Sequence, residues 1–177
     1  MPLAVLYQRV IAPAMHELGR LWEEGAITTA DEHLATGLTH RVLAALRPPE
    51  LLEKALMPRP GKPRALLAAV QGEQHALGLR MAADLLEDTG YWVAYLGADV
   101  PTASLLQAVD RLSPDLLALS ATMPESRQRL EDAAETVRAE YPQVVLLIGG
   151  QGSGSLRLRE GTAVENLELL AEKVLLP

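Results

Sequence analysis

Cysteine and phenylalanine are both absent from the 177 residues of this chain. Without cysteine, disulfides and thiolate metal ligands are excluded, which fits a cytoplasmic protein. Without phenylalanine, the core must come mainly from leucine, alanine and valine, within the 49% of residues that are hydrophobic. The length suffices for one sizeable domain or two small ones.

Long apolar runs and basic runs are also missing. No stretch of about 20 uncharged apolar residues exists to cross a membrane, and the N-terminus shows no signal-peptide pattern. The formal net charge is −7, whereas nucleic-acid-binding proteins usually present a basic face. We therefore expect no membrane partner, and contact with DNA only through a domain that this chain lacks.

The first part of the chain has helical periodicity. Apolar residues recur at near-helical spacing up to Gly25, and a second helix is expected from about Ala30 to Leu46. Its apolar stripe consists of Leu34, Leu38, Val42 and Leu46. We predict an incomplete helical-bundle cap over residues 1–47. Residues 48–63 hold five prolines and are expected to be a linker.

From residue 64 onward, short apolar runs alternate with helical stretches. The pattern predicts strands at 64–70, 92–96, 115–119, 143–148 and 161–164, with helices at 75–88, 102–112, 125–140 and 165–175. Such alternation is typical of parallel strands joined by right-handed crossovers. Residues 64–177 are thus predicted to form an α/β domain, a doubly wound, five-stranded parallel sheet of the flavodoxin type.

This topology predicts where a ligand binds. In strand order 2-1-3-4-5, the loops after strands one and three diverge at a crevice. The residues that these loops and the loop after strand four bring there are Glu73, His75, Gly78, Ser120, Thr122, Gly149 and Gly150.

Three familiar sites fit these loops poorly. A dinucleotide fingerprint requires its glycines after the first strand, but the glycine cluster here follows strand four. A P-loop requires a lysine after its second glycine, and none is in that register. A phosphoacceptor domain requires an aspartate where strand three ends at Ser120.

Glu73, His75 and Gly78 spell E-x-H-x-x-G. A histidine at a strand end can present its imidazole to a metal, and a nearby carboxylate can fix its tautomer. Gly78 would let a bulky group approach the following helix. The competing interpretation is a partly exposed loop histidine without a ligand, which is the commoner situation for an isolated histidine.

The order of these signals resembles the cobalamin-binding fold of methionine synthase, corrinoid proteins and adenosylcobalamin mutases. Their D-x-H-x-x-G, S-x-L or S-x-T, and G-G motifs are matched by Glu73-Gln74-His75-Ala-Leu-Gly78, Ser120-Ala-Thr122 and Gly149-Gly150. The resemblance implies that His75 is the lower axial ligand of cobalt. It also implies that the cofactor's benzimidazole tail lies near Ser120, Thr122 and the glycines. Glu73 is one methylene longer than the usual aspartate.

The helical part shows a second pattern, Trp22 followed by Glu32 and His33, or W-x9-E-H. It resembles the light-sensing domain of CarH and LitR type photoreceptor-repressors, which use adenosylcobalamin. The resemblance implies that Trp22 packs against the adenosyl group and that Glu32 hydrogen-bonds it. His33 would contact the cofactor or another subunit. It further implies a self-associating, light-responsive regulator that is not an enzyme.

Each of these residues also has an ordinary explanation. Trp22 can be a core anchor, and Thr29-Ala-Asp-Glu32 matches a capping box in which Glu32 bonds back to the helix start. His33 can be a solvated residue of the first turn. One departure concerns the position after Trp22, where relatives of this type have a histidine and this chain has Glu23.

Three other functions remain open from the sequence. A corrinoid shuttle protein in methyl transfer shares the helical cap and E/D-x-H-x-x-G, and a B12-responsive antirepressor shares the cofactor site. A nucleotide-binding flavodoxin-like module would share only the fold. The pattern of Trp22, Glu32 and His33 favours the light sensor, because it suits a bulky adenosyl group.

Overall fold

The computed structural model describes residues 1–48, 58, 60–151 and 162–163. It divides into two compact units, Met1–Leu56 and Met57–Pro177, which are described one at a time. Within the described residues, no helix combines the length and the apolar character that a membrane span requires.

The first unit is a pair of helical segments. The first segment runs through α1 (Leu3–Leu6), the π-helical η1 (Tyr7–Ile11) and α2 (Ala12–Glu23), and the second is α3 (Thr29–Ala45). Gly25 lies in the turn between them with φ +71°, a conformation that glycine adopts without steric cost. The two predicted helices and the break at Gly25 agree with this arrangement.

A capping box begins α3, one residue earlier than the sequence suggested. The Thr28 hydroxyl accepts a hydrogen bond from the Asp31 N–H at 3.2 Å, and the Asp31 carboxylate accepts one from the Thr28 N–H at 3.0 Å. The alternative interpretation, in which Thr29 and Glu32 form the box, is therefore wrong. Asp31 takes the position three residues after the cap, so capping does not explain Glu32.

The predicted apolar stripe of α3 lies on an exposed side of the helix. Leu34 is 65% exposed, and Leu38 and Val42 are exposed by about half, whereas Leu43 is buried. The residue that packs is thus on a different side from the stripe. Apolar residues occur on more than one side of α3, so helical spacing alone does not identify its packed face.

The second unit is built on a parallel sheet with strand order β2-β1-β3-β4-β5. The strands are β1 (Arg64–Val70), β2 (Trp92–Val100), β3 (Leu116–Ser120), β4 (Val145–Gly149) and β5 (Thr162–Ala163). The doubly wound order is as predicted. The expectation of five full strands needs correction, since four are substantial and β5 has two residues. The helix predicted at 165–175 lies outside the described residues.

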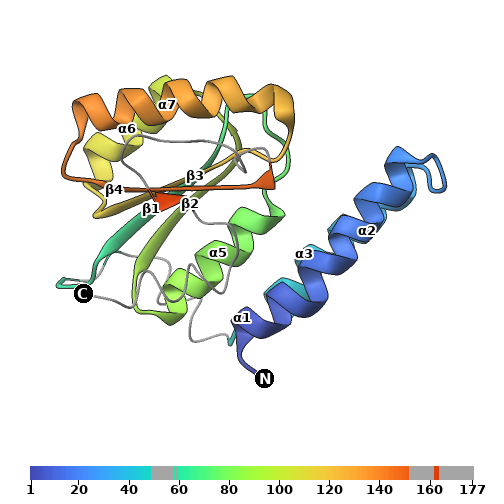
Figure 1. The fold of residues 1–177 in the computed structure, drawn as a ribbon. Coiled ribbons are helices and arrows are strands. Elements are labelled where there is room, and N and C mark those ends of the chain that lie inside the picture. Colours follow the sequence, from blue (N-terminus) through green and yellow to red (C-terminus); the bar gives the residue numbers. More distant parts are fainter. Residues whose placement is uncertain (49–57, 59, 152–161, 164–177) are drawn as a thin grey trace. The chain divides into compact units, whose positions relative to one another are not determined.

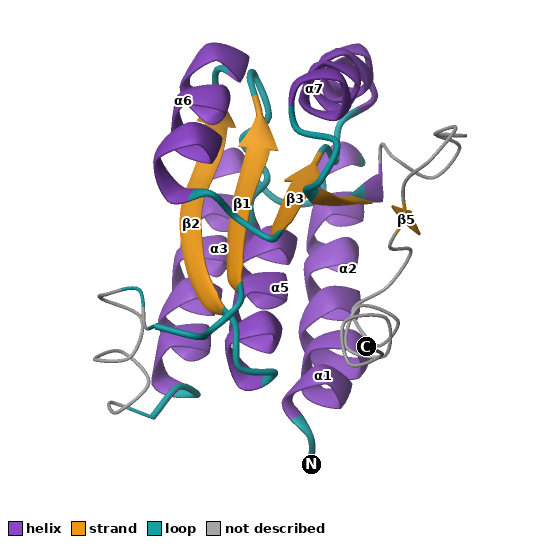
Figure 2. Ribbon diagram, turned by 90° about the vertical axis from the view of Figure 1, so that its left-hand side faces the viewer, coloured by secondary structure: helices purple, strands orange, loops and turns teal. Residues whose placement is uncertain are grey.

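Helices cover both faces of this sheet (Figure 1). Helix α5 (Leu77–Asp88) lies on one face, and α6 (Thr102–Leu112) and α7 (Arg127–Glu140) lie on the other. A single 3₁₀ turn, η2 (Pro124–Ser126), precedes α7. Figure 2 shows β2, β1 and β3 side by side, with their carboxyl ends pointing the same way.

Alternation along β1 explains why the strand is apolar throughout. Leu66, Ala68 and Val70 pack with α6 and α7, whereas Ala65, Leu67 and Ala69 pack with α5. Because both faces are covered, every second position is buried on each side and no polar face is needed. The loops at the carboxyl edge of the sheet are then the natural place for polar chemistry.

Candidate functional site

The carboxyl ends of β1, β3 and β4 meet at one edge of the sheet. Ala69 pairs in register with Ser120, and Ser120 pairs with Gly149. Strand alternation places all three on the face that α5 covers, because their neighbours Leu67, Ala118 and Leu147 pack there. A row of small residues therefore crosses the sheet directly below the crevice loops.

Glu73 joins the loops after β1 and β3. Its side chain is fully buried, and its Oε1 accepts hydrogen bonds from the His75 N–H at 2.8 Å and from His75 Nδ1 at 2.7 Å. Its Oε2 accepts hydrogen bonds from the N–H groups of Thr122 and Met123 at 2.8 and 2.9 Å. The extra methylene of a glutamate is thus accommodated, and both carboxylate oxygens are used.

These contacts determine the ionisation of Glu73. Burial alone would raise the pKa of this carboxyl, but the hydrogen bonds from Met123, His75 and Thr122 together outweigh burial and lower the pKa. The carboxylate is then ionised at neutral pH and can only accept hydrogen bonds. It follows that His75 Nδ1 carries a proton and donates it, and in the neutral imidazole this leaves the lone pair on Nε2.

The His75 imidazole is accessible. Its side chain is 57% exposed, although its partner Glu73 has no exposed surface. Gly78, in the first turn of α5, has open space where a Cβ would lie, since no described atom outside its chain neighbours and the backbone of its own helix comes within 4 Å of that position. An imidazole with a free Nε2 beside an uncrowded helix start can accept a large ligand from solvent.

Ser120 supplies a buried polar group to the same edge. The residue is 6% exposed, and its hydroxyl has no hydrogen-bond partner within the described part of the chain. Gly150 has φ +97°, and a Cβ there would overlap with the backbone of Ala121. The crevice therefore contains a close contact between two backbone segments, at Gly150 and Ala121. It also contains a hydroxyl, that of Ser120, with which a bound ligand can form a hydrogen bond.

Some contributors to this site carry no sequence signal. The Met123 contact uses a backbone N–H, which no side-chain pattern reveals. Asp99 accepts a hydrogen bond from the Gly72 N–H at 2.7 Å, and Arg129 packs its guanidinium against Gly72. The position of Asp99 in the sequence does not indicate a contact with the loop that carries His75. That contact is recognisable only once β2 is known to pair with β1.

The helical unit brings its predicted residues close together in a different way. Trp22 is 44% exposed and donates a hydrogen bond from its indole N–H to the Thr29 hydroxyl at 3.2 Å. Glu32 accepts a hydrogen bond from the Thr36 hydroxyl and pairs with His33 Nδ1, each at 2.6 Å. The indole is thus tied to the first turn of α3, which also carries the carboxylate and imidazole.

The sequence-predicted residues therefore form two groups. Glu73, His75 and Thr122 are in direct contact, and Ser120, Gly149 and Gly150 lie at the same sheet edge. Gln74 and Gly78 are exposed beside them. The second group is Trp22, Glu32 and His33 in the helical unit.

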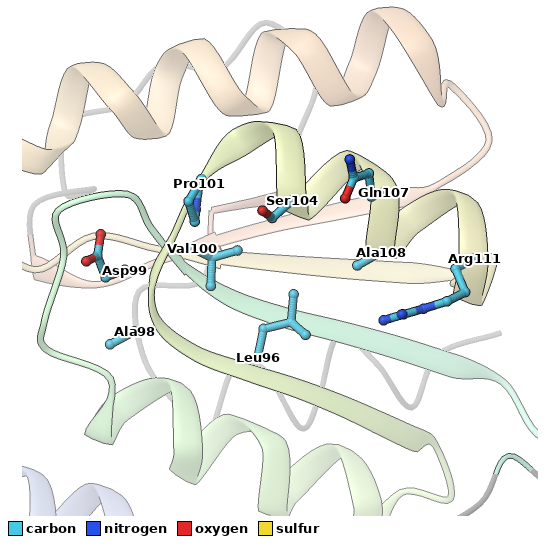
Figure 3. Close-up of a pocket in the computed structure, with 9 residues that line it drawn as sticks. All are labelled: Leu96, Ala98, Asp99, Val100, Pro101, Ser104, Gln107, Ala108 and Arg111. Atoms are coloured by element: carbon cyan, nitrogen blue, oxygen red, sulfur yellow. The ribbon is translucent and has the colours of Figure 1, made fainter.

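A separate groove of about 430 Å³ runs along β2 and α6 (Figure 3). Leu96 and Val100 come from the strand, and Ser104, Gln107 and Arg111 come from the helix. Asp99 lies at one end of the groove and Arg111 at the other. The groove contains none of the crevice residues predicted from the sequence.

Fold and site together define a parallel α/β ligand-binding domain with an oriented histidine at its crevice. A family model described as "B12 binding domain" matches residues 63–164, and a second model with the same description matches residues 1–47. The chain therefore belongs to the family of B12-binding domains.

Two regulators are among its relatives. The chain is 31% identical to the HTH-type transcriptional repressor CarH of Myxococcus xanthus over 156 residues, which are 88% of this chain and 50% of CarH. It is 35% identical to the repressor CarA of the same organism over 146 residues, which are 81% of this chain and 46% of CarA. The chain thus spans about half the length of these relatives. The resemblance to a CarH-type cobalamin-binding domain is confirmed.

Corrinoid proteins are also related. The chain is 25% identical to dimethylamine corrinoid protein 2 of Methanosarcina acetivorans over 155 residues, which are 83% of this chain and 68% of that protein. The solved structure of the monomethylamine corrinoid protein of Methanosarcina barkeri matches with a TM-score of 0.78 and 20% identity. The match covers 99% of this chain and 84% of that one and shows a shared fold.

Proposed function

We propose that this cobalamin-binding chain is the light-sensing part of a transcriptional regulator that acts in the cytoplasm. It holds adenosylcobalamin with His75 in place of the cofactor's own base, and light changes its conformation or its oligomeric state. Contact with DNA belongs to a part of the regulator outside this sequence.

The arrangement of Glu73 and His75 carries the proposal. Glu73 fixes the imidazole tautomer through a 2.7 Å hydrogen bond, and the imidazole is more than half exposed. Nε2 of His75 is then available as a ligand to cobalt, as expected for an imidazole oriented by a carboxylate. The Ser120 hydroxyl, which has no hydrogen-bond partner among the described residues, and the open space at Gly78 suit a large group with a buried tail.

The cofactor supplies a cobalt–carbon bond that light breaks. The chain's contribution at the upper side comes from Trp22, Glu32 and His33. The exposed indole of Trp22 offers a flat apolar surface to an adenine or ribose ring, and its N–H is already bonded to Thr29. The Glu32 carboxylate offers acceptor oxygens to the sugar hydroxyls. Trp22, Glu32 and His33 would lose a shared partner if the adenosyl group were removed, so the ligand would bias a two-state element.

Gel filtration in the dark and in the light tests this function. The chain loaded with adenosylcobalamin is expected to elute in the dark at an apparent mass at least twice that after illumination. The reason is that self-association is tied to the group that light removes. The same chain loaded with hydroxocobalamin, which has no cobalt–carbon bond, should elute identically in both conditions. Equal elution of the adenosylcobalamin sample in light and dark would count against light sensing.

A corrinoid shuttle is the second candidate, favoured by the similarity to dimethylamine corrinoid proteins over most of the chain. A shuttle would carry a methyl group, which is far smaller than adenosyl. It would have no use for an aromatic surface that contacts a nucleoside. The two functions therefore differ in what they require of Trp22.

The Trp22→Ala variant separates these functions. If Trp22 packs against the adenosyl group, the variant should bind adenosylcobalamin about tenfold to a hundredfold more weakly, or about 1.4 to 2.8 kcal/mol. Its affinity for methylcobalamin should stay within about twofold. Titrations followed by absorption measure both values. Trp92→Phe, at the start of β2, is the matched control and should bind both cofactors normally. An unchanged affinity for adenosylcobalamin in Trp22→Ala would favour the shuttle.

A further inference from the structure

Asp99, near the end of β2, has a backbone conformation that is uncommon for its residue type. Its φ is +53°, and in the described part of the chain only Ser113 shares a positive φ without being glycine. Aspartate tolerates this left-handed region better than most residues but still adopts it at a steric cost. A compensating interaction is therefore expected at Asp99.

The compensation is a pair of hydrogen bonds to the loop that carries the histidine. The Asp99 N–H donates to the Glu73 carbonyl at 2.9 Å, and the Asp99 carboxylate accepts from the Gly72 N–H at 2.7 Å. Gly72 itself has φ +82°. Asp99 thus holds the two peptide units that flank the Gly72–Glu73 segment, one through the Gly72 N–H and the other through the Glu73 carbonyl.

The end of β2 is shaped to make this contact. The pairing of β1 with β2 is regular from Arg64 to Leu67 and then shifts twice, between Leu67 and Ala68 and between Ala68 and Val70. Gly97, with φ +82°, lies in the shifted part. Irregularities of this kind re-aim a strand, and here they bring Asp99 over the loop after β1. Figure 3 shows the Asp99 carboxylate at the end of the β2 strand, away from Leu96 in the middle of the groove.

Asp99 affects the position of His75 through Glu73, whose buried carboxylate bonds to the imidazole. The side chain of Glu73 fixes the His75 imidazole, and its carbonyl and the neighbouring Gly72 N–H are fixed by Asp99. We propose that Asp99 is a positioning residue for His75. It sets the place and tautomer of the imidazole from the neighbouring strand. The proposal rests on the proposed role of His75 as a cobalt ligand.

Two substitutions of Asp99 and one control substitution at Ser113 separate positioning from folding. Asp99→Asn keeps an acceptor oxygen and tolerates the left-handed backbone, so it should behave like the parent protein. Asp99→Gly removes the steric cost and the acceptor together, so its fold should be at least as stable as that of Asp99→Ala. Ser113→Gly is the matched control, because it relieves the other positive φ far along the chain from the loop.

The first readout is the axial ligand in the loaded protein. With ¹⁵N-labelled histidine, the electron paramagnetic resonance spectrum of the cobalt(II) cofactor shows doublets when imidazole is bound. It shows triplets when the unlabelled benzimidazole is bound. Asp99→Gly should lose part of the doublet signal and bind cobalamin about tenfold more weakly, as expected when the support of a metal ligand is removed. Asp99→Asn and Ser113→Gly should match the parent protein.

The second readout needs no cofactor. The ¹⁵N chemical shifts of the His75 ring should show the Nδ1–H tautomer in the parent protein and a tautomer mixture in Asp99→Gly. Unchanged tautomer, affinity and doublet signal in Asp99→Gly would overturn the proposal. If the parent protein shows no doublets but Asp99→Gly alters the tautomer, the cobalt role of His75 fails while the positioning role stands.

Discussion

Replacing His75 by alanine is expected to abolish coordination of cobalt by the protein while leaving the fold nearly intact. The side chain is more than half exposed, and Glu73 keeps three backbone N–H donors without the imidazole. The loss of one hydrogen bond should cost about 1 kcal/mol of unfolding free energy. The effect on the cofactor should be far larger, because no other group is held at that position by Glu73.

The measurement compares the axial ligand in the two proteins. With ¹⁵N-labelled histidine and the cobalt(II) cofactor, the parent protein should give doublets in the electron paramagnetic resonance spectrum. His75→Ala should give triplets from the cofactor's own base. Loss of a residue that merely supports a metal ligand typically costs 10- to 100-fold in affinity. Loss of the ligand itself should weaken cobalamin binding by about 100-fold or more.

His40→Ala provides the matched control, because His40 is an exposed helix histidine outside both groups of site residues. It should keep the doublets and the parent affinity. Persistence of the doublets in His75→Ala would mean that a different histidine binds cobalt, and the site at the sheet edge would have to be abandoned.

The periodicity of the second unit was sufficient to predict its strands and their order. Strands buried on both faces are apolar at every position, so runs such as 65–70 and 116–119 stand out against the polar loops. Motif spacing then placed Glu73, His75 and Ser120 at the same edge. Parallel topology brings their loops together wherever the strands pair.

Prediction was weaker where the outcome depends on contacts between distant segments. Asp99 and Met123 contribute a bulged strand end and a backbone N–H, and neither leaves a pattern in the sequence. In the helical unit, Thr28 and Thr29 both match the cap motif, and the capping box forms at Thr28, not at Thr29. A box at Thr29 would have given Glu32 an ordinary role, whereas the Glu32 carboxylate bonds to Thr36 and His33 instead.

Glu73→Gln is expected to produce the largest loss of stability among single changes in this site. The two carboxylate oxygens accept four hydrogen bonds, two at each oxygen. A glutamine side chain has one oxygen and one NH₂ group, so whichever side receives the NH₂ faces N–H donors. Leaving buried donors unpaired costs about 1 to 3 kcal/mol each, so we expect a loss of about 2 to 4 kcal/mol at neutral pH.

The orientation of the amide also decides what happens to His75. If the NH₂ group faces Thr122 and Met123, the connection between the loops after β1 and β3 is lost. If it faces His75, the imidazole can pair with it only by accepting at Nδ1, which moves the proton to Nε2. Nε2 can then no longer ligate a metal. Cobalamin binding through histidine should therefore weaken in either case, by about 10- to 100-fold.

The loss of stability in Glu73→Gln is expected to depend on pH. The pKa of Glu73 is lower in the folded protein than its ordinary value, so the folded state binds its proton less readily than the unfolded state does. The resulting stabilisation is complete above the ordinary carboxyl pKa and is lost as pH falls through the folded pKa. The stability difference between the parent protein and Glu73→Gln should thus be constant near pH 7 and shrink below about pH 4.5.

Urea unfolding from pH 7 down to acid measures this difference. In a Trp22→Phe background, Trp92 at the start of β2 is the remaining tryptophan and reports on the sheet unit. Glu131→Gln, on the partly exposed side of α7, is the matched control and should change stability by no more than about 0.5 kcal/mol at any pH. A stability difference between the parent protein and Glu73→Gln that stays constant down to the most acidic pH would show that the buried carboxylate is not the group that organises these loops.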